Sequence, residues 1–454
     1  MPGLFTTLTT AADAMGVYAK ALNTVSNNVE NAGTAGYARQ DFNVVAQPFD
    51  PSAGLPGGIA AGEIQNSRDQ YAEQAVWTDQ QGFGQADQSV TELSAIEPLF
   101  NVTGDSGIPQ ALNAFFGSLS ALSVSPNDSV TRNNVLSSAT QLAHQFNSVA
   151  TGLGNASLAL NQKITSAADT INGLTQQIAA LNGQIGNDAR TGTDPAVDAS
   201  MHNALESLAE YANITVLKQP GGAVTVLMDG QTPLVMGNRQ YLISASGATG
   251  TAVVKDSLGN NVTAQLLGGR LKALADMKNT VIPGYSSSLN QLASGISDQV
   301  NNTLLNGVDT SGNQGAPLFG YNSPADAAAT MQVNGITTDQ LAAALPGAPG
   351  GNGNALALAA LANSPEIGSM TFTDAYSSLA SQVGQSLNTA TQDQTTQQDL
   401  LDQARSTRSD TEGVSLDVEA TKMIEYQRSY QATAHMVTIL NDLTQSVMDM
   451  LSAT

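Results

Sequence analysis

An apolar residue recurs at every third or fourth position along the first 29 residues of the chain. The steps between these residues alternate strictly between four and three, for about four heptads. A helix with this repeat has one narrow apolar stripe, and it is stable only when another element covers that stripe. The sequence therefore predicts a long N-terminal helix with an apolar seam. The seam consists of Leu4, Leu8, Ala11, Met15, Tyr18, Leu22, Val25 and Val29.

The C-terminal segment has a similar pattern. A helix is predicted after Gly413, where the acidic residues Asp417 and Glu419 suit a helix N-terminus. Two interpretations stay open: each terminal helix packs on its own domain, or the two ends pair with each other or with neighbouring molecules. The apolar positions of this second helix are Ile424, Tyr426, Tyr430, Met436, Leu440, Leu443, Val447 and Met450.

The middle of the chain combines long helical patterns with one stretch of a different kind. A third seam with the same alternation runs from Leu160 to Ile185. Between about residues 213 and 267, short β-branched runs alternate with hairpin turns such as Asp229-Gly230. Further helices are predicted at about 68–100, 109–122, 269–305 and 373–407.

These patterns predict a mainly α fold with an inserted β domain. The terminal helices would form a coiled-coil-like pair, and two discontinuous parts of the chain would form a bundle of long helices. The inserted domain would be a small antiparallel sheet. The predicted domains are a terminal assembly domain (1–60 and 412–454), a helical bundle (61–205 and 270–411) and the β domain (206–269).

Composition narrows the class of protein. Only 12% of the residues are charged, and 38 acidic against 16 basic residues give a formal net charge of −22. Without a basic cluster, nucleic acid and anionic membranes are not expected as partners. No apolar run approaches the roughly 18–20 residues of a membrane span. The N-terminus lacks a basic segment followed by an apolar one, which predicts a cytosolic protein or one exported with its N-terminus retained.

No pattern of catalytic or ligand-binding residues stands out. The chain has no cysteine, and its three histidines, His144, His202 and His435, lack a metal-ligand spacing. The run from Asp309 to Gly320 lacks the glycine and glutamate that a calcium loop needs at its sixth and twelfth positions. We therefore expect a structural protein with no cofactor, metal or catalytic residue. The alternative from another class is an enzyme with scattered residues in the β insertion.

The stretch "NTVSNNVENAGTAGYARQ", residues 23–40, resembles the N-terminal signature of bacterial flagellar rod, hook and hook-associated proteins. The C-terminal helical segment after Gly413 is similar to the matching C-terminal helix of that family. Three stretches, at 36–40, 266–301 and 354–361, are similar to the hook-associated protein 1 family within it. The signature positions here are Asn27, Asn28, Val29, Asn31, Gly36 and Tyr37.

The resemblance implies a structural subunit that joins the flagellar hook to the filament and polymerises through both terminal helices. Both seams and the signature positions would form the assembly interface. The implied partners are like subunits, the hook protein on one side, a second hook-associated junction protein on the other, and an export chaperone at the C-terminal region. The implied location is the extracellular flagellum, reached through type III export without a cleaved signal peptide. A hook or distal rod subunit is the alternative. The chain is short for the family, which a missing or reduced outer domain would explain.

Overall fold

The computed structural model describes residues 2–50, 55–100, 106–187, 194–247 and 250–452. The chain divides into two compact units. Unit 1 comprises Met1–Gln81, Asn172–Leu242 and Gln398–Thr454, and unit 2 comprises Gly82–Ile171 and Ile243–Gln397. Helices α2 (Gln70–Ile96), α4 (Ser129–Asn187) and α10 (Phe372–Glu412) contribute residues to both units. The mainly helical fold with small antiparallel sheets agrees with the predicted fold class.

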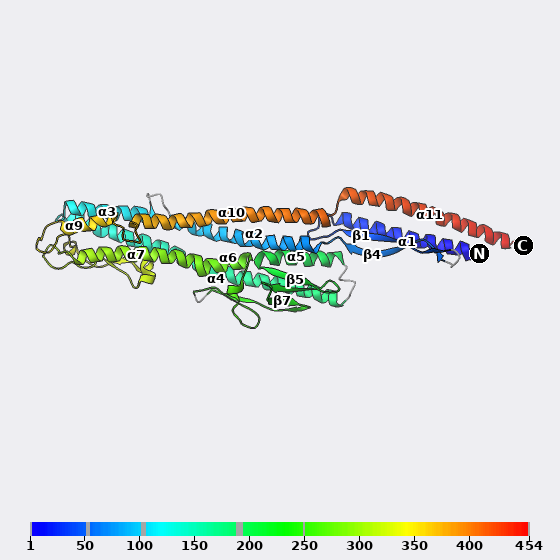
Figure 1. Cartoon of the computed structure of the whole chain (residues 1–454), viewed down its shortest axis with the longest axis horizontal. Coiled ribbons are helices and arrows are strands. Elements are labelled where there is room, and N and C mark those ends of the chain that lie inside the picture. Colours follow the sequence, from blue (N-terminus) through cyan, green and yellow to red (C-terminus); the bar gives the residue numbers. More distant parts are fainter. Residues whose placement is uncertain (1, 51–54, 101–105, 188–193, 248–249, 453–454) are drawn as a thin grey trace. The chain divides into compact units, whose positions relative to one another are not determined.

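The two ends of the chain pair with each other in unit 1. Helix α1 (Pro2–Glu30) lies along α11 (Leu416–Ser452), and the start of α1 is at the same end as the finish of α11 (Figure 1). The two helices are therefore antiparallel. Of the interpretations that the sequence left open, intrachain pairing is the one observed.

A β-hairpin that the sequence analysis did not predict follows α1. Strand β1 (Gln40–Ala46) pairs antiparallel with β4 (Ile59–Asn66), with a bulge between Phe42 and Val44. The short strands β2 (Phe49–Asp50) and β3 (Leu55–Pro56) extend it. Strands β1, β3 and β4 also contact α1, so this hairpin is a neighbour of α1 in addition to α11.

Unit 1 also contains helix α5 and a four-stranded meander. Helix α5 (Pro195–Tyr211) begins at Asp194, whose side chain accepts a hydrogen bond from the Ala196 amide. Strands β5 (Ile214–Lys218), β6 (Val224–Met228), β7 (Thr232–Met236) and β8 (Arg239–Gln240) pair antiparallel in sequence order. Asn182 of α4 holds this sheet, because its side chain bonds to both the N–H and the C=O of Val224 and to the Gly237 carbonyl.

The predicted β domain differs from this arrangement at both ends. Residues 206–211 belong to α5, and the strands β9 (Ser244–Ser246) and β10 (Val253–Lys255) belong to unit 2 rather than to the meander. The two units also cut the chain at places other than the predicted domain boundaries. The three-domain organisation stays a prediction.

Unit 2 is a helical unit with an aromatic core. Its remaining helices are α3 (Gly107–Val124), α6 (Gly269–Asp276), α7 (Ile282–Leu305), α8 (Ala327–Thr330) and α9 (Gly353–Ala360), with a π-helical turn at Met277–Val281 and a short strand pair, β11 (Phe319–Gly320) and β12 (Gln332–Val333). The rings of Phe115, Phe116, Phe319 and Phe372 contact one another in its core.

The third seam is confirmed along α4. Of its eight positions, seven are buried, and Leu174 is half-buried. Within the described ranges, no helix combines the length and the apolar character that crossing a bilayer requires.

Candidate assembly surface

Helix α1 buries a face that only partly coincides with its predicted seam. Ala11 and Val25 are buried, while Val29 is exposed. Four further residues, Val17, Ala21, Thr24 and Asn28, are buried although they lie off the seam. The cause is that α1 contacts both α11 and β4, so its covered face is wider than a two-helix seam. The other predicted positions are half-buried: Leu4, Leu8, Met15, Tyr18 and Leu22.

Helix α11 divides its predicted apolar residues between two faces. Tyr426, Tyr430, Leu440 and Val447 are half-buried. A second set stays in solvent, and it includes Ile439, which the sequence analysis did not single out and which is 60% exposed. We call the part of it that shares one face the outer stripe: Met436, Ile439, Leu443 and Met450. Ile424 is also exposed, but it lies twelve residues before Met436 and apart from this stripe. A contiguous exposed apolar patch on a helix marks a surface that another protein covers.

Asn28 joins the end of α1 to the start of α11. Its side chain is fully buried, and its Nδ2 donates to the Gln40 carbonyl (2.9 Å) and to Glu419 Oε2 (3.0 Å). Its Oδ1 accepts from the Gln40 amide (2.9 Å) and from the Tyr37 hydroxyl (2.8 Å). Burial, with a smaller effect of Glu419, raises the pKa of Tyr37 to about 12, so the hydroxyl keeps its proton as a donor. Asn28 therefore acts as an intrachain connection, which its position in a helix-end signature did not reveal.

The remaining signature residues shape the turn that leaves α1. Asn31 donates to the Asn27 carbonyl (2.9 Å) and accepts from Thr34 (3.1 Å). Gly36 has φ +71° and lies against α5, where Asn203 Nδ2 donates to the adjacent Ala35 carbonyl (2.9 Å). The predicted helix end and turn are confirmed here.

Gly36→Ala is expected to destabilise unit 1. A Cβ at this position would lie 2.5 Å from Asn203 Oδ1 and 2.7 Å from the Ala199 carbonyl, in a backbone conformation that alanine disfavours. We expect a loss of about 1–3 kcal/mol in the free energy of unfolding, measured by denaturant titration. The matched control is Gly33→Ala, where a Cβ would meet nothing within 4 Å, and we expect a change of at most about 0.5 kcal/mol. Equal effects of the two variants would contradict this account.

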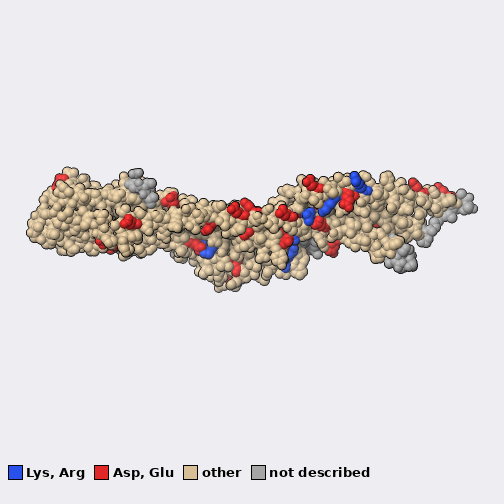
Figure 2. All heavy atoms as spheres, turned by 45° about the horizontal axis from the view of Figure 1, so that its top comes forward, with Lys and Arg blue, Asp and Glu red and all other residues tan. Residues whose placement is uncertain are grey.

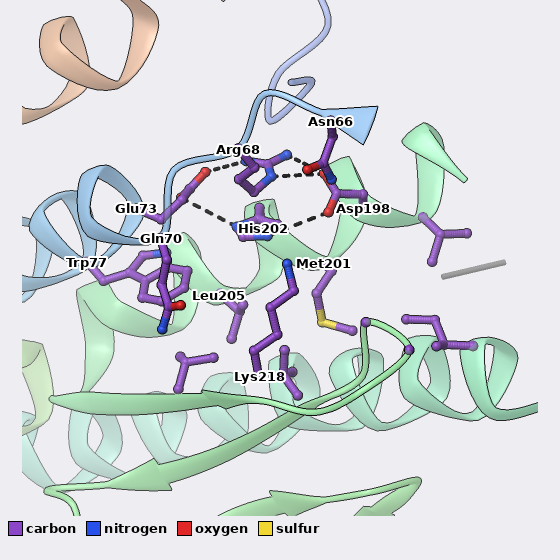
Figure 3. Close-up of a pocket in the computed structure, with 16 residues that line it drawn as sticks. Asn66, Arg68, Gln70, Glu73, Trp77, Asp198, Met201, His202, Leu205 and Lys218 are labelled. Atoms are coloured by element: carbon purple, nitrogen blue, oxygen red, sulfur yellow. Dashed lines mark hydrogen bonds and ion pairs between the residues drawn. The ribbon is translucent and has the colours of Figure 1, made fainter. Parts of the chain in front are cut away.

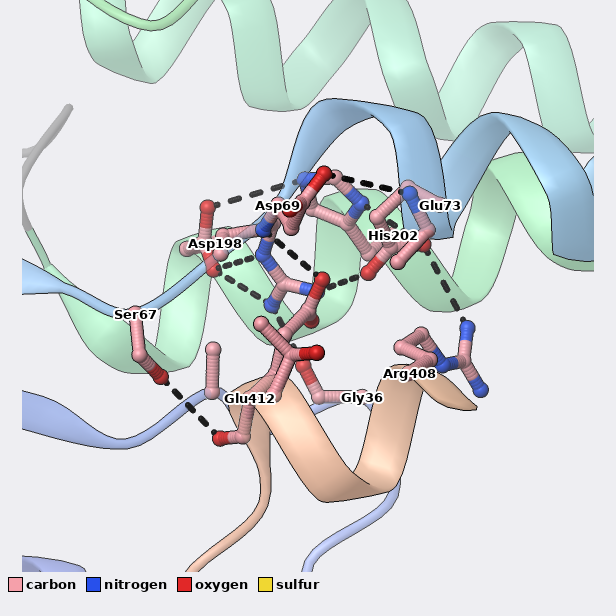
Figure 4. A network of polar contacts seen from close by, with 12 residues as sticks. Gly36, Ser67, Asp69, Glu73, Asp198, His202, Arg408 and Glu412 are labelled. Carbon is pink, nitrogen blue, oxygen red and sulfur yellow. Dashed lines mark hydrogen bonds and ion pairs between the residues drawn. The ribbon is translucent and has the colours of Figure 1, made fainter. Parts of the chain in front are cut away.

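A buried ionic network lies where α10 meets the link from β4 to α2 (Figure 4). Arg68 has a side chain only 4% exposed; it contacts Glu73, Glu412 (3.2 Å) and Asp198 (2.6 Å) and donates to the Gly36 carbonyl (2.7 Å). His202 Nδ1 lies 3.4 Å from Glu73 Oε2. We call this set the Arg68 network: Arg68, Glu73, Asp198, His202, Glu206, Arg405, Arg408 and Glu412.

A cavity of about 310 Å³ borders the network (Figure 3). Trp77, Leu205 and Val224 contribute apolar lining, and the Trp77 ring stacks on His202 with 5.9 Å between centroids. Arg68 and Glu73 line its polar edge but are already paired with each other. The cavity is therefore partly apolar and partly polar, and Arg68 and Glu73 at its edge are engaged in the ionic network. Among the residues that the structure describes, no group of three or more His, Asp or Glu side chains could hold a metal ion.

Charged side chains are sparse on the surface. On the face seen in Figure 2, most of the surface is neither acidic nor basic. This agrees with the low charged fraction of the sequence, 12%. A surface of this kind is suited to contacts through apolar and uncharged polar groups rather than through charge.

The sequence matches two protein families. Residues 93–319, half of the chain, match the family described as Flagellar hook-associated protein FlgK helical domain. Residues 408–450, which include most of α11, match the family described as Flagellar basal body rod FlgEFG protein C-terminal. The second match covers all residues of the outer stripe.

Relatives align over nearly the whole chain. Flagellar hook-associated protein 1 of Bacillus subtilis (strain 168) is 28% identical over 506 aligned residues, covering 99% of each chain. Flagellar hook-associated protein 1 of Salmonella typhimurium is 25% identical over 537 aligned residues, covering 94% of this chain and 97% of the relative.

A solved structure shares the fold. The flagellar hook junction protein FlgK from Burkholderia pseudomallei superimposes with a TM-score of 0.67 at 16% identity, over 76% of this chain and all of that one. With a family match over half of the sequence, the chain belongs to the flagellar hook-associated protein FlgK family, whose members are structural, extracellular axial components of the flagellum.

Proposed function

We propose that the chain is the structural subunit that joins hook to filament, and that it polymerises through the terminal pair of α1 and α11. The observation that carries the proposal is the outer stripe. Helix α11 has one face along α1, yet the four large apolar side chains of the outer stripe stay exposed on its other surface. In a ring or tube of like subunits, the neighbouring terminal pair would cover them. Heterologous contacts of this kind repeat from subunit to subunit instead of closing into a dimer.

The predicted interface includes residues with different roles in the single chain. Ile424, Met436, Leu443 and Met450 are available for contacts with other subunits, since they are exposed. Asn28 and Val25 are buried within the chain, so they would support the interface by holding α1 in place. Val29 and Asn27 are exposed at the end of α1 and are available for contact.

The proposed assembly also has partners other than like subunits. We propose the hook protein on one side of the assembled subunits and a second hook-associated junction protein on the other. Before export, the outer stripe would be an aggregation hazard in the cytosol. A dedicated export chaperone that binds α11 would cover it, and the chain would then leave through the flagellar type III apparatus with its N-terminus retained.

Deletion of the gene, followed by electron microscopy of the cells, tests this function. We expect hooks that carry no filament, flagellin lost to the medium, and restored filaments when the wild-type gene is supplied. A missing hook, or a rod that ends early, would instead identify a hook or distal rod subunit. Normal filaments in the deletion strain would exclude any junction role.

A further inference from the structure

Two carboxyl groups of the Arg68 network share one guanidinium nitrogen. Glu73 Oε1 and Glu412 Oε2 both contact Arg68 Nη1, the second at 3.2 Å. The side chains of Glu73 and Glu412 are only 1% and 5% exposed. Two ionised carboxylates that are buried beside one guanidinium nitrogen repel each other, and a proton on one of them removes that repulsion. The geometry therefore holds a place for one proton.

The charge balance of the network also indicates that one proton is bound. Its four carboxyl groups face three guanidinium groups, so one negative charge is left over unless a proton is bound. His202 is the other group that could carry that proton, since it contacts Glu73 (3.4 Å) and Asp198 (3.7 Å). The nearby charges on other elements are Asp69, which caps the first turn of α2, and the cluster of Arg39, Asp41, Glu419 and Lys422.

Glu412 lies at the break between the two long C-terminal helices. It is the last residue of α10, and α11 begins at Leu416. Its carbonyl accepts from the Arg39 amide (2.8 Å) and from the Ser67 hydroxyl (3.1 Å), and its Oε1 accepts from the Asp69 amide (2.9 Å). This one residue thus connects the break between α10 and α11 to both segments that flank the β1–β4 hairpin.

We propose that Glu73 and Glu412 form a proton-binding site that locks the α10–α11 junction. With one proton bound, the two carboxyl groups no longer repel each other, both keep their contact with Arg68, and the junction holds α11 in register with α1. When that proton is lost, two buried carboxylates repel each other beside a single guanidinium, and the junction loosens. Because α11 carries the outer stripe, the bound proton controls how rigidly that stripe is held relative to α1.

The electrostatics of the two groups agree with this geometry. Burial and the neighbouring charge of Glu73 raise the pKa of Glu412 to about 7 from its ordinary value of 4.5. Burial acts to raise the pKa of Glu73 as well, but contacts with His202, Arg68 and Arg408 outweigh it and lower that pKa to about 2. The folded junction therefore binds a proton that the opened junction releases between pH 4.5 and 7. Its stability is highest at the acid side of this window and falls as the pH rises through it.

Hydrogen exchange on the full chain tests the proposal. The reporters are the amides of Asp69 and Arg39, which both donate to Glu412. After correction for the intrinsic exchange rate, wild-type protection should fall by up to about tenfold per pH unit from pH 5 to 7 and level off above. Glu412→Gln, which mimics the protonated acid, should remove this dependence and keep protection high at pH 8.

Two further variants separate the proton site from its neighbours. Glu206→Gln neutralises another carboxyl of the same network and should keep the dependence on pH. His202→Gln should keep it too. If the dependence survives in Glu412→Gln but disappears in His202→Gln, the proton is bound at the imidazole and the proposal is wrong.

If the variants do not fold, an infrared titration of the wild-type chain labelled with ¹³C-glutamate tests whether a carboxyl group of the junction is protonated. A protonated glutamic acid band that persists above pH 6 supports the bound proton. If no such band remains above pH 5, both carboxyl groups are ionised and the proposal fails.

Discussion

Leu443→Asp is expected to abolish polymerisation while leaving the isolated chain folded. Leu443 is 48% exposed in the middle of the outer stripe, so an aspartate there is hydrated in the monomer and costs little. In the assembled junction the same carboxylate would be buried without a partner, at about 3–5 kcal/mol for each subunit contact. That cost weakens association by at least about a hundredfold at every contact. The measurements are thermal unfolding of the monomer and electron microscopy of a complemented deletion strain.

Gln431→Asp is the matched control. Gln431 is also exposed on α11, but it lies outside the outer stripe, twelve residues before Leu443 and about 120° around the helix from it. The same new charge at this position should permit filaments. If Leu443→Asp unfolds the monomer, the outer stripe belongs to an intrachain core. If it assembles normally, neighbouring subunits do not cover the stripe. Leu22→Asp would be less decisive, because Leu22 is half-buried within the chain.

Asn28→Ala is expected to have the opposite effect, damaging the terminal pair in the monomer itself. The change removes four hydrogen bonds at once and leaves the Gln40 amide and carbonyl, the Tyr37 hydroxyl and one oxygen of Glu419 without this partner. Buried polar groups that lose their partners cost about 1–3 kcal/mol each, less where water can enter. We expect a total loss of about 2–4 kcal/mol, seen as early melting of the terminal helices and faster proteolysis of both ends.

Asn27→Ala is the control for this prediction. Asn27 is the neighbouring residue on α1, but it is exposed, and only its side-chain oxygen takes part in contacts with Tyr37 and Asn31. A change of less than about 1 kcal/mol is expected there. If Asn27→Ala and Asn28→Ala behave alike, or if Asn28→Ala leaves the ends resistant to protease, the buried connection between α1 and α11 does not hold the terminal pair.

Local periodicity predicted most of the helices because it is a property of neighbouring residues. The seam of α4 is an example: seven of its eight positions are buried, as a 3.6-residue period requires. The seam of α1 was predicted less well, because the β1–β4 hairpin covers a second face of that helix. The apolar residues Phe42, Val44 and Ala46 alternate with other residues in the segment 40–46, and this alternation is the local signal for the hairpin that was not predicted.

The buried polar contacts could not be predicted in the same way. Asn28 was interpreted as a helix-end residue, since its partner Glu419 lies in another helix at the far end of the chain. Arg68 was not singled out at all, because its carboxyl partners come from α2, α5 and α10. A lone arginine in a sequence gives no sign that three separate segments will surround it.

The antiparallel pairing of α1 with α11 has a consequence for how the molecule is made. Asn28 and Glu419 are 391 residues apart, so α1 is synthesised long before its helical partner α11, and within unit 1 the β1–β4 hairpin is the neighbour that is made soon after it. Until α11 is present, the face of α1 that packs on α11 stays uncovered, and a single helix has little stability of its own. The hydrogen bond from Asn28 to Glu419 can form only after almost the whole chain has been made. Any chain that stops early would lack both the cover for α1 and the outer stripe. Under the proposed function, the terminal pair would therefore test whether a chain is complete, because only a full-length subunit has the outer stripe with which to join its neighbours.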